Sequence, residues 1–318
     1  MNYRSIADLA NVVNLNQHKI HLDVDLVVGI PRSGLLAAST IALALNIPVI
    51  DLESFIENRK IVHGGTRKTR GTPPEYAHDA KHVLIVDDSV RTGGTVWHAT
   101  RRVDESSFAG RHTTCAVFAT RKGCSAVDLY FETVASPRAF EWNLFHKPSI
   151  QYCCVDIDGV LCVDPTRTEN DDGEKYGEFL LNAKPLTRPT AKIGALVTSR
   201  LEKYRRETEA WLKTNEIRYD DLVMLDLPDA ESRRRLGAHG KFKAETYAKY
   251  PGAHLFIESN PHQSLEIAQL TGRDVLCFSN QQIYRPEMSV KTVHAGARKV
   301  IARGIRRAKR LTRQLSLK

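Results

Sequence analysis

Short apolar runs that end in small or polar residues recur along the chain. In the first half the clearest are residues 26–29 and 83–86, and each precedes a segment with helical character. Uninterrupted runs of about four aliphatic residues are typical of strands that are buried on both faces of a parallel sheet. Their alternation with helices predicts an α/β domain with a twisted parallel sheet.

The same alternation begins again after a short polar link at residues 146–149. Three further apolar runs, which end in carboxylates or hydroxyls, are residues 152–155, 195–197 and 255–257. These runs indicate a second set of strands, separate from those of the first half.

We therefore expect two domains, residues 1–148 and 149–292, followed by a tail at 293–318. The chain has 318 residues and 42% hydrophobic content, which is enough for two buried cores. The six cysteines have no regular spacing, and Cys153 and Cys154 are adjacent on a predicted strand, where they cannot form an ordinary disulfide. This use of cysteine favours a reducing cytoplasm.

Apolar residues return every three or four positions in the tail, which predicts a basic amphipathic C-terminal helix. Nine of the 46 Lys and Arg residues lie after residue 294 with no acidic residue among them, so the rest of the chain balances its 37 acidic residues. Such a helix can dock on its own protein, on an anionic membrane or on nucleic acid. The membrane is favoured, because each basic residue adds about 1 kcal/mol there and the tail has no aromatic residue for base stacking.

The chain shows no secretory signal at its start and no apolar run near the roughly 20 residues that span a bilayer. We therefore expect a cytoplasmic protein, placed at the inner face of the cytoplasmic membrane if the tail binds lipid. No nucleic-acid partner is expected.

The first candidate site follows the run at 83–86, where Asp87 and Asp88 precede a turn of small residues and then a helix. Open α/β sheets bind ligands at the carboxyl ends of their strands. Small residues let backbone N–H groups close around a phosphate, and the helix N-terminus favours negative charge. The carboxylates suit ribose hydroxyls and a shared Mg2+. No Gly-Lys-Ser/Thr follows, so a Walker phosphate loop is excluded.

This residue order resembles the 5-phosphoribosyl-1-pyrophosphate (PRPP) motif of type I phosphoribosyltransferases. The resemblance implies that Asp87 and Asp88 bind the ribose hydroxyls of PRPP. The residues that it assigns to the 5′-phosphate are Ser89, Val90, Arg91, Thr92, Gly93, Gly94 and Thr95. Residues 30–34 are similar to the family's pyrophosphate loop, which often carries a cis peptide, and this implies that Arg32, Ser33 and Gly34 hold the leaving group.

Two other stretches of the first half leave alternatives open. The polar residues 63–76 are either a solvated loop or the family's flap, in which Arg67 and Lys68 would cover PRPP and exclude water. In residues 137–143, Glu141 and Trp142 either contact the acceptor or take part in core packing.

In the second half, Asp156-Ile157-Asp158-Gly159-Val160-Leu161 resembles motif I of the haloacid dehalogenase (HAD) superfamily of phosphatases. The resemblance implies that the second domain is also a Rossmann-like parallel-sheet domain, with an HAD-like fold in which Asp156 is the nucleophile and Asp158 the acid/base. Thr198 matches motif II, with Ser199 as the alternative, and Lys243 matches motif III.

Motif IV corresponds to Glu258 and Asn260, which with Asp156 and Asp158 would bind Mg2+. Many relatives carry an acidic residue at the position of Asn260, so a weaker metal site is expected. The short insert at residues 162–192 implies a minimal cap and an open site, which suits a bulky substrate.

The two resemblances together are similar to the PRPP-dependent ribofuranosyltransferase and phosphatase modules of bacterial O-antigen and capsule synthesis. They imply transfer of 5-phosphoribose from PRPP to an acceptor, expected to be a lipid-linked glycan, and then removal of the 5-phosphate. A nucleobase phosphoribosyltransferase with an attached nucleotidase is one alternative, and a PRPP-sensing regulator that binds nucleic acid is another. The sequence is compatible with an oligomer but fixes neither the acceptor nor the anomeric outcome nor the general base.

Overall fold

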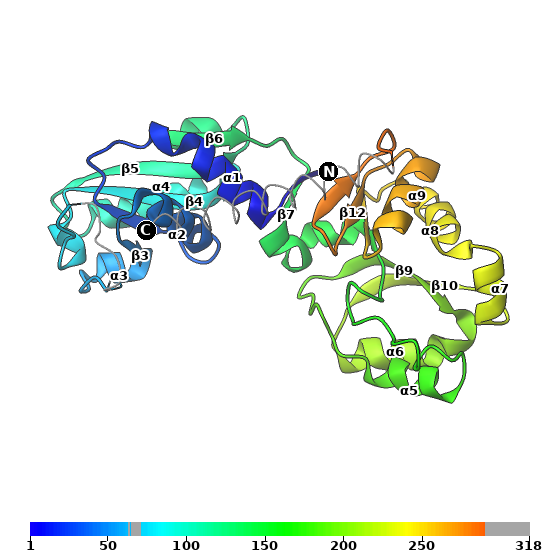
Figure 1. Ribbon diagram of the computed structural model, residues 1–318. Coiled ribbons are helices and arrows are strands. Elements are labelled where there is room, and N and C mark those ends of the chain that lie inside the picture. The colour runs from blue at the N-terminus through cyan, green and yellow to red at the C-terminus, as the bar shows by residue number, and fades with distance from the viewer. Residues whose placement is uncertain (63, 65–70, 290–318) are drawn as a thin grey trace, which may run out of the picture. The chain divides into compact units, whose positions relative to one another are not determined.

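The computed structural model describes residues 1–62, 64 and 71–289, and the chain forms two compact units, with the second beginning at Asn143 (Figure 1). The sequence places this boundary later, after residue 148. Residues 143–148 fold with the second unit, because the Phe145 ring packs edge-on against Phe278 with centroids 5.8 Å apart. Its carbonyl oxygen also accepts a 3.1 Å hydrogen bond from the backbone N–H of Thr190.

The first unit contains a five-stranded, fully parallel sheet in the order β3-β2-β4-β5-β6. The strands are β2 (Leu26–Gly29), β3 (Val49–Asp51), β4 (His82–Val90), β5 (Arg111–Ala119) and β6 (Leu129–Thr133). The strand order reverses between β2 and β4, and open sheets of this kind bind ligands at such a reversal. The predicted parallel α/β fold of the first half is confirmed.

Helices cover both faces of this sheet. They are α1 (Ile6–Asn16), α2 (Gly34–Leu45), α3 (Leu52–Ile56) and α4 (Gly94–Asp104), with 3-10 turns η1 (Gln17–Lys19), η2 (Ala77–Asp79) and η3 (Gly123–Ala126). Side chains of β2 alternate between two cores, so that Val27 packs with α1 and α2, whereas Leu26 and Val28 pack with α3 and α4. A separate short pair joins β1 (Asn2–Arg4) in parallel to β7 (Arg138–Phe140).

The second unit has a six-stranded sheet in the order β10-β9-β8-β11-β12-β13. Its strands are β8 (Cys153–Val155), β9 (Ile193–Leu201), β10 (Tyr219–Leu225), β11 (Leu255–Glu258), β12 (Val275–Cys277) and β13 (Gln282–Tyr284). Only β13, at the edge, is antiparallel to its neighbour. Here the strand order reverses between β8 and β11, which places the residues after these two strands at the expected ligand position.

The helices of the second unit are α5 (Glu174–Asn182), α6 (Arg205–Thr214), α7 (Ala230–Arg235), α8 (Ala238–Ala248) and α9 (Pro261–Thr271). The remaining 3-10 turns are η4 (Glu141–His146), η5 (Pro148–Tyr152) and η6 (Glu202–Tyr204). The short insert between β8 and β9 contains α5, which packs against α6. The indole N–H of Trp211 donates a 2.7 Å hydrogen bond to the carbonyl oxygen of Ala183 and so holds the C-terminal end of α5.

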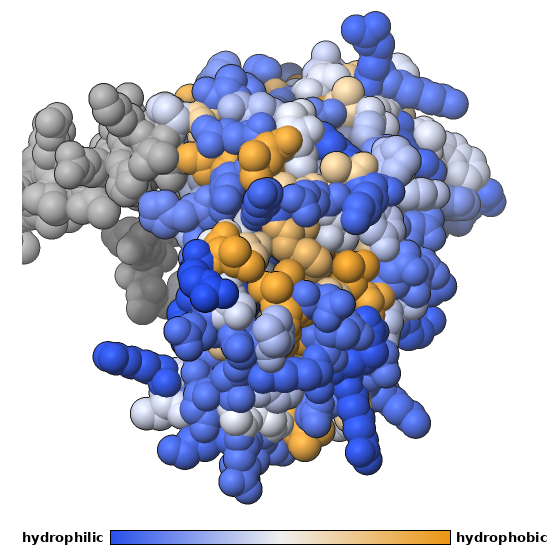
Figure 2. All heavy atoms as spheres, turned by 90° about the vertical axis from the view of Figure 1, so that its right-hand side faces the viewer, coloured by the Kyte–Doolittle hydropathy of each residue, from blue (hydrophilic) through white to orange (hydrophobic). Residues whose placement is uncertain are grey.

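The surface and the cysteines add three observations. Figure 2 shows a face of the second unit that is mainly hydrophilic, with apolar side chains in small groups. All six cysteines are free, as expected for the adjacent Cys153 and Cys154. None of the helices in the described part of the chain is long and apolar enough to cross a bilayer. The predicted helix at 293–318 and the flap residues Arg67 and Lys68 lie outside the described residues.

Candidate functional site

In the first unit, the two predicted PRPP motifs lie against each other at the strand reversal. The backbone N–H of Ile30 donates to the carbonyl oxygen of Val86 at 2.9 Å, and the peptide bond between Pro31 and Arg32 is cis. At Gly34 a Cβ atom would lie 2.8 Å from the carbonyl oxygen of Val86 and 3.2 Å from the Cα of Asp87, so only glycine permits this approach. The expected pyrophosphate loop therefore touches the strand that carries the acidic pair.

The acidic pair lies inside β4, which continues four residues beyond the predicted run. Asp88 is only 3% exposed, and its Oδ2 accepts a 2.7 Å hydrogen bond from the indole N–H of Trp142. The Trp142 ring stacks on Phe140 with centroids 5.1 Å apart. Glu141 instead accepts from the backbone N–H of Ile6 at 2.7 Å and so holds the start of α1. Residues 140–142 thus combine core packing with a direct contact to the acidic pair.

The predicted phosphate turn is shared between three elements. Ser89 and Val90 pair with β5, residues 91–93 form the turn, and α4 starts at Gly94. Gly93 has a φ of 91°, and a Cβ there would lie 2.3 Å from the Cβ of Ala126, so the turn needs glycine on both counts. The N-terminus of α4 consequently follows directly on the turn, an arrangement that favours an anion.

Arg138 on β7 is a neighbour of the acidic pair that the sequence pattern did not reveal. Its guanidinium lies 5.4 Å from the centre of the Phe140 ring, and one terminal nitrogen has no hydrogen-bond partner among the described residues. Burial lowers the pKa of Arg138, while the negative charges of Asp88 and Asp87 oppose this. The local sequence gives no signal for this contact, because it depends on the pairing of β7 with the distant β1.

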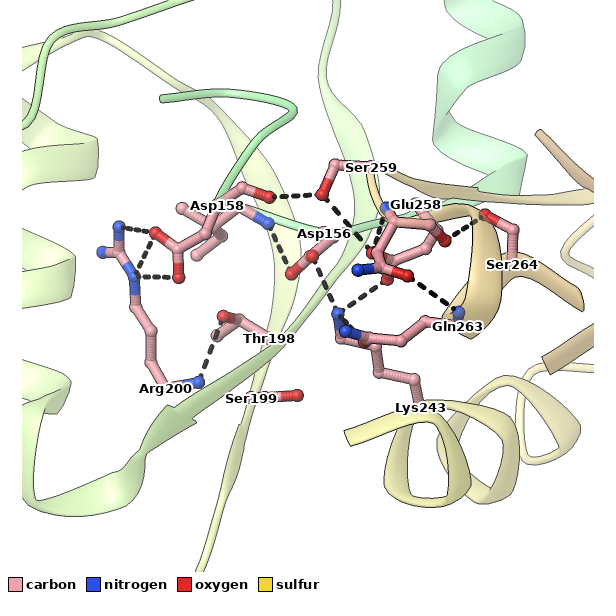
Figure 3. A network of polar contacts seen from close by, with 12 residues as sticks. Asp156, Asp158, Thr198, Ser199, Arg200, Lys243, Glu258, Ser259, Gln263 and Ser264 are labelled. Carbon is pink, nitrogen blue, oxygen red and sulfur yellow. Dashed lines mark hydrogen bonds and ion pairs between the residues drawn. The ribbon is translucent and has the colours of Figure 1, made fainter. Parts of the chain in front are cut away.

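In the second unit, three charged side chains meet at the strand reversal, and we call Asp156, Lys243 and Glu258 the buried triad (Figure 3). The Lys243 ammonium is 3% exposed and donates to Asp156 Oδ2 at 2.8 Å, to Glu258 Oε2 at 2.6 Å and to Gln263 Oε1 at 3.1 Å. Its three N–H donors are therefore all used. The structure brings one predicted residue from each of motifs I, III and IV into one cluster.

The buried triad contains two carboxyl groups and one ammonium group. Burial raises the pKa of Asp156 above its ordinary value, and the Lys243 ammonium opposes the rise. Asp156 Oδ1 also accepts from the backbone N–H of Ile157 at 2.8 Å, which fixes the carboxylate plane. The Glu258 carboxylate is fixed in the same way, because its Oε1 accepts a 2.9 Å hydrogen bond from the backbone N–H of Asn260.

Asp158, the predicted acid/base, is paired with Arg200. The Arg200 side chain is completely buried, and its Nη2 and Nε donate to Asp158 Oδ1 and Oδ2 at 2.7 and 3.1 Å. Burial would raise the pKa of Asp158, but the Arg200 guanidinium lowers it below its ordinary value. In this arrangement Asp158 is held as an anion. Arg200 was missed because nothing in the local pattern shows that a residue at the end of β9 turns inward.

The two motif II candidates differ in their surroundings. Thr198 is fully buried, and its hydroxyl accepts from the backbone N–H of Arg200 at 3.2 Å. The Ser199 hydroxyl is buried without a partner among the described residues and lines a cavity. Asn260 is the N-cap of α9, with its amide oxygen accepting from His262 N and Gln263 N. The structure gives this oxygen two donors, and its role as a metal ligand stays a prediction.

The cavity has a volume of about 500 Å³, and the residues that line it include the buried triad. No group of three or more His, Cys, Asp or Glu among the described residues is arranged to hold a metal ion. The carboxylates of Asp156 and Glu258 are nevertheless the oxygen donors that a hard cation prefers. Asp158 is turned to Arg200 instead, so the predicted ligand set is only partly assembled.

Comparison with known proteins identifies the first unit. Residues 2–149 match the phosphoribosyl transferase domain family, so the N-terminal part of the chain is a type I phosphoribosyltransferase domain. Xanthine-guanine phosphoribosyltransferase of Chromohalobacter salexigens is 29% identical over 127 residues, which are 39% of this chain and 72% of that protein. Orotate phosphoribosyltransferase of Staphylothermus marinus is 30% identical over 114 residues, 36% of this chain but only about half (51%) of that protein. A purine phosphoribosyltransferase structure from Pyrococcus horikoshii has 19% identity and a TM-score of 0.31, covering 44% of this chain and 92% of that one.

The contact between Trp142 and Asp88 yields a first prediction. Trp142→Phe keeps the stacked ring but removes the N–H donor, and a hydrogen bond to a charged group contributes about 1.5–3 kcal/mol. We expect PRPP to bind at least about tenfold more weakly, as measured by calorimetry. Trp211→Phe is the matched control, because it also removes a buried indole hydrogen bond, to the carbonyl oxygen of Ala183, but lies in the second unit. Equal PRPP affinity of the Trp142 variant and wild type would show that the indole does not position Asp88.

The pair of Asp158 and Arg200 yields a second prediction. Arg200→Met leaves a buried carboxylate without its cation, which should lower the free energy of unfolding by about 3–5 kcal/mol at pH 7. Adding Asp158→Asn removes that charge and should restore most of the loss, as urea unfolding will show.

The pH dependence of this deficit has a defined sign. Because the folded-state pKa of Asp158 is lowered, the ion pair stabilises the protein above the unfolded pKa of about 3.9 and is lost as the pH falls through the folded value. The deficit of Arg200→Met should therefore shrink on acidification below about pH 4. A deficit that grows in acid would contradict the ion-pair account.

Proposed function

We propose that the chain carries out two consecutive reactions. The first unit transfers 5-phosphoribose from PRPP to an acceptor and releases pyrophosphate, and the second unit removes the 5-phosphate from the product. The observation that carries this proposal is the presence, on one chain, of two sheets that each place acidic side chains at a strand reversal. The match of residues 2–149 to phosphoribosyltransferases supports the first step.

In the first unit, Asp87 and Asp88 would hold the ribose hydroxyls. Residues 32–34 would hold pyrophosphate through backbone N–H groups and the Arg32 guanidinium. The turn from Ser89 to Thr95 and the N-terminus of α4 would hold the 5′-phosphate. The bond between the anomeric carbon and pyrophosphate breaks, and the acceptor forms a new bond to that carbon and gives up its proton. Asp87 and Asp88 would hold Mg2+, which would supply charge neutralisation for the leaving group.

In the second unit, we infer an HAD-type phosphatase. Asp156 would attack phosphorus through a carboxylate oxygen, the bond to the sugar oxygen would break, and that oxygen would take a proton from Asp158. Water would then attack the acyl phosphate, release inorganic phosphate and restore the carboxylate. Lys243 holds Asp156 in place, and Thr198 or Ser199 would donate to the phosphoryl group. Mg2+, held by Asp156 and Glu258, would offset the charge of that group.

The acceptor is proposed to be a lipid-linked glycan. Salvage of a nucleobase would end at the nucleotide and would gain nothing from removal of the 5-phosphate, whereas a ribofuranosyl glycan requires this removal. A nucleobase acceptor is the second candidate, because the two relatives are a xanthine-guanine and an orotate phosphoribosyltransferase. Incubation with PRPP, Mg2+ and a panel of glycans and bases separates the two by the mass of the product.

The sequence of steps is tested by Asp156→Asn. An amide cannot form the acyl phosphate, so the variant should still release pyrophosphate but stop at the phosphoribosyl product, which is heavier by one phosphate than the wild-type product. Wild-type protein added afterwards should convert it. Asp87→Asn with Asp88→Asn is the reciprocal control, which should lose pyrophosphate release but still dephosphorylate a supplied phosphoribosyl product. Normal dephosphorylation by the Asp156 variant would refute the sequential proposal.

The tail at residues 293–318 is proposed to bind an anionic membrane, where its basic residues are attracted to acidic lipids. A chain that ends at Gly296 should turn over a water-soluble acceptor at the wild-type rate but bind vesicles containing phosphatidylserine far more weakly in flotation assays. The difference should shrink at high salt. Equal flotation of the two chains would exclude the tail as the membrane contact.

A further inference from the structure

Arg233 on α7 is a buried cation to which the described part of the chain supplies no carboxylate partner. It lines the same cavity as the buried triad and is only 7% exposed. Its Nη1 donates to the carbonyl oxygen of Ser199 at 2.8 Å, while its Nε is buried with no hydrogen-bond partner among the described residues. Within the same residues no carboxylate forms an ion pair with it.

The groups around Arg233 do not supply the missing charge. The Ser199 hydroxyl, in a residue that is 8% exposed, is likewise buried without a partner and faces the same cavity. The Tyr176 hydroxyl lies beside Arg233, and burial raises its pKa, so it stays neutral. His239 also lines the cavity, and burial, with the charges of Arg233 and Lys243, lowers its pKa to about 4, so it is neutral at pH 7.

The charged groups that line the cavity therefore differ in how far their charges are compensated. At the buried triad two carboxylates face one ammonium group, and Asp158 is neutralised by Arg200. At Arg233 a full positive charge and an unused hydroxyl remain. An unpaired buried ion costs several kcal/mol, and buried donors without partners add to this cost. A ligand with negatively charged oxygen atoms would offset both.

We propose that Arg233, Ser199 and Tyr176 form an oxyanion-binding subsite, which takes a phosphoryl or carboxylate group of the substrate of the second unit. The inference rests on the proposed phosphatase function for the identity of that substrate. Arg233 would donate through Nε, and Ser199 through its hydroxyl, while the hydrogen bond from Nη1 to the Ser199 backbone keeps the guanidinium in position. The subsite makes α7 part of substrate recognition.

Binding of inorganic phosphate tests the subsite without relying on activity. Arg233→Met should weaken the phosphate binding of the second unit at least tenfold, measured by calorimetry and by the phosphate-dependent rise in Tm, and Ser199→Ala should weaken it less. Arg234→Met is the matched control, since Arg234 is on the same helix but exposed. The first unit is the same in all these proteins, so any phosphate that it binds cancels in the comparison. Equal phosphate binding by the Arg233 and Arg234 variants would overturn the subsite.

Two substrates then identify the group that the subsite holds. If it is the transferred phosphoryl group, Arg233→Met should lose kcat/KM equally on p-nitrophenyl phosphate and on orotidine 5′-monophosphate. If it is a second anionic group, the loss should be confined to orotidine 5′-monophosphate, which also carries a carboxylate. Either pattern supports the subsite, and unchanged kcat/KM on both substrates would overturn it. If wild type hydrolyses neither but its phosphate binding still depends on Arg233, the phosphatase proposal fails and the subsite stands.

Discussion

The second unit depends on the Lys243 ammonium group. It is buried between the ends of β8 and β11, the two strands where the sheet order reverses, and it joins α8 to both through Asp156 and Glu258. Removing one partner of such a buried pair typically costs about 3–5 kcal/mol, because the other charge is left uncompensated. The carboxylates proposed for chemistry are thus the same groups that hold the central strands and α8 together.

The first unit holds its acidic pair by a different kind of contact. Asp88 is buried about as deeply as Asp156, yet the donor to its carboxylate is the neutral indole of Trp142. A neutral donor fixes the position of a carboxylate without cancelling its charge, so any offset of the negative field of this pair comes from Arg138 instead. In the second unit the Lys243 ammonium group offsets part of the negative charge of the neighbouring carboxylates. The net charge of this site therefore depends on Glu258 and on the protonation state of Asp158.

Local sequence patterns predicted polar residues near the carboxyl ends of strands, although Asp87 and Glu258 lie inside β4 and β11 rather than after them. Asp87, Asp156 and Glu258 could be placed at sheet edges because an aliphatic run fixes where a strand lies and hence where its carboxyl end falls. The extent of β4 was not predictable in this way, since Ser89 and Val90 read as a turn but pair with β5. Arg200, Arg233 and Trp142 were not assigned their contacts, because each reaches its partner across the fold from a position without any periodic signal.

The environments of Asp156 and Asp158 set a condition on the proposed phosphatase reaction. A nucleophilic carboxylate must be ionised, and a general acid must carry a proton. Burial acts against ionisation of Asp156, whereas Arg200 acts against protonation of Asp158, so the two directions are the reverse of those that the roles need. The 2.8 Å hydrogen bond from the Lys243 ammonium group favours the ionised form of Asp156. Asp158 can receive a proton only after it separates from Arg200.

Because Arg200 is fully buried and also contacts Cys162 and Thr208, the Asp158 carboxylate rather than the Arg200 guanidinium is the group that can turn away. Rotation of the Asp158 side chain toward the cavity is therefore the step on which the acid role depends.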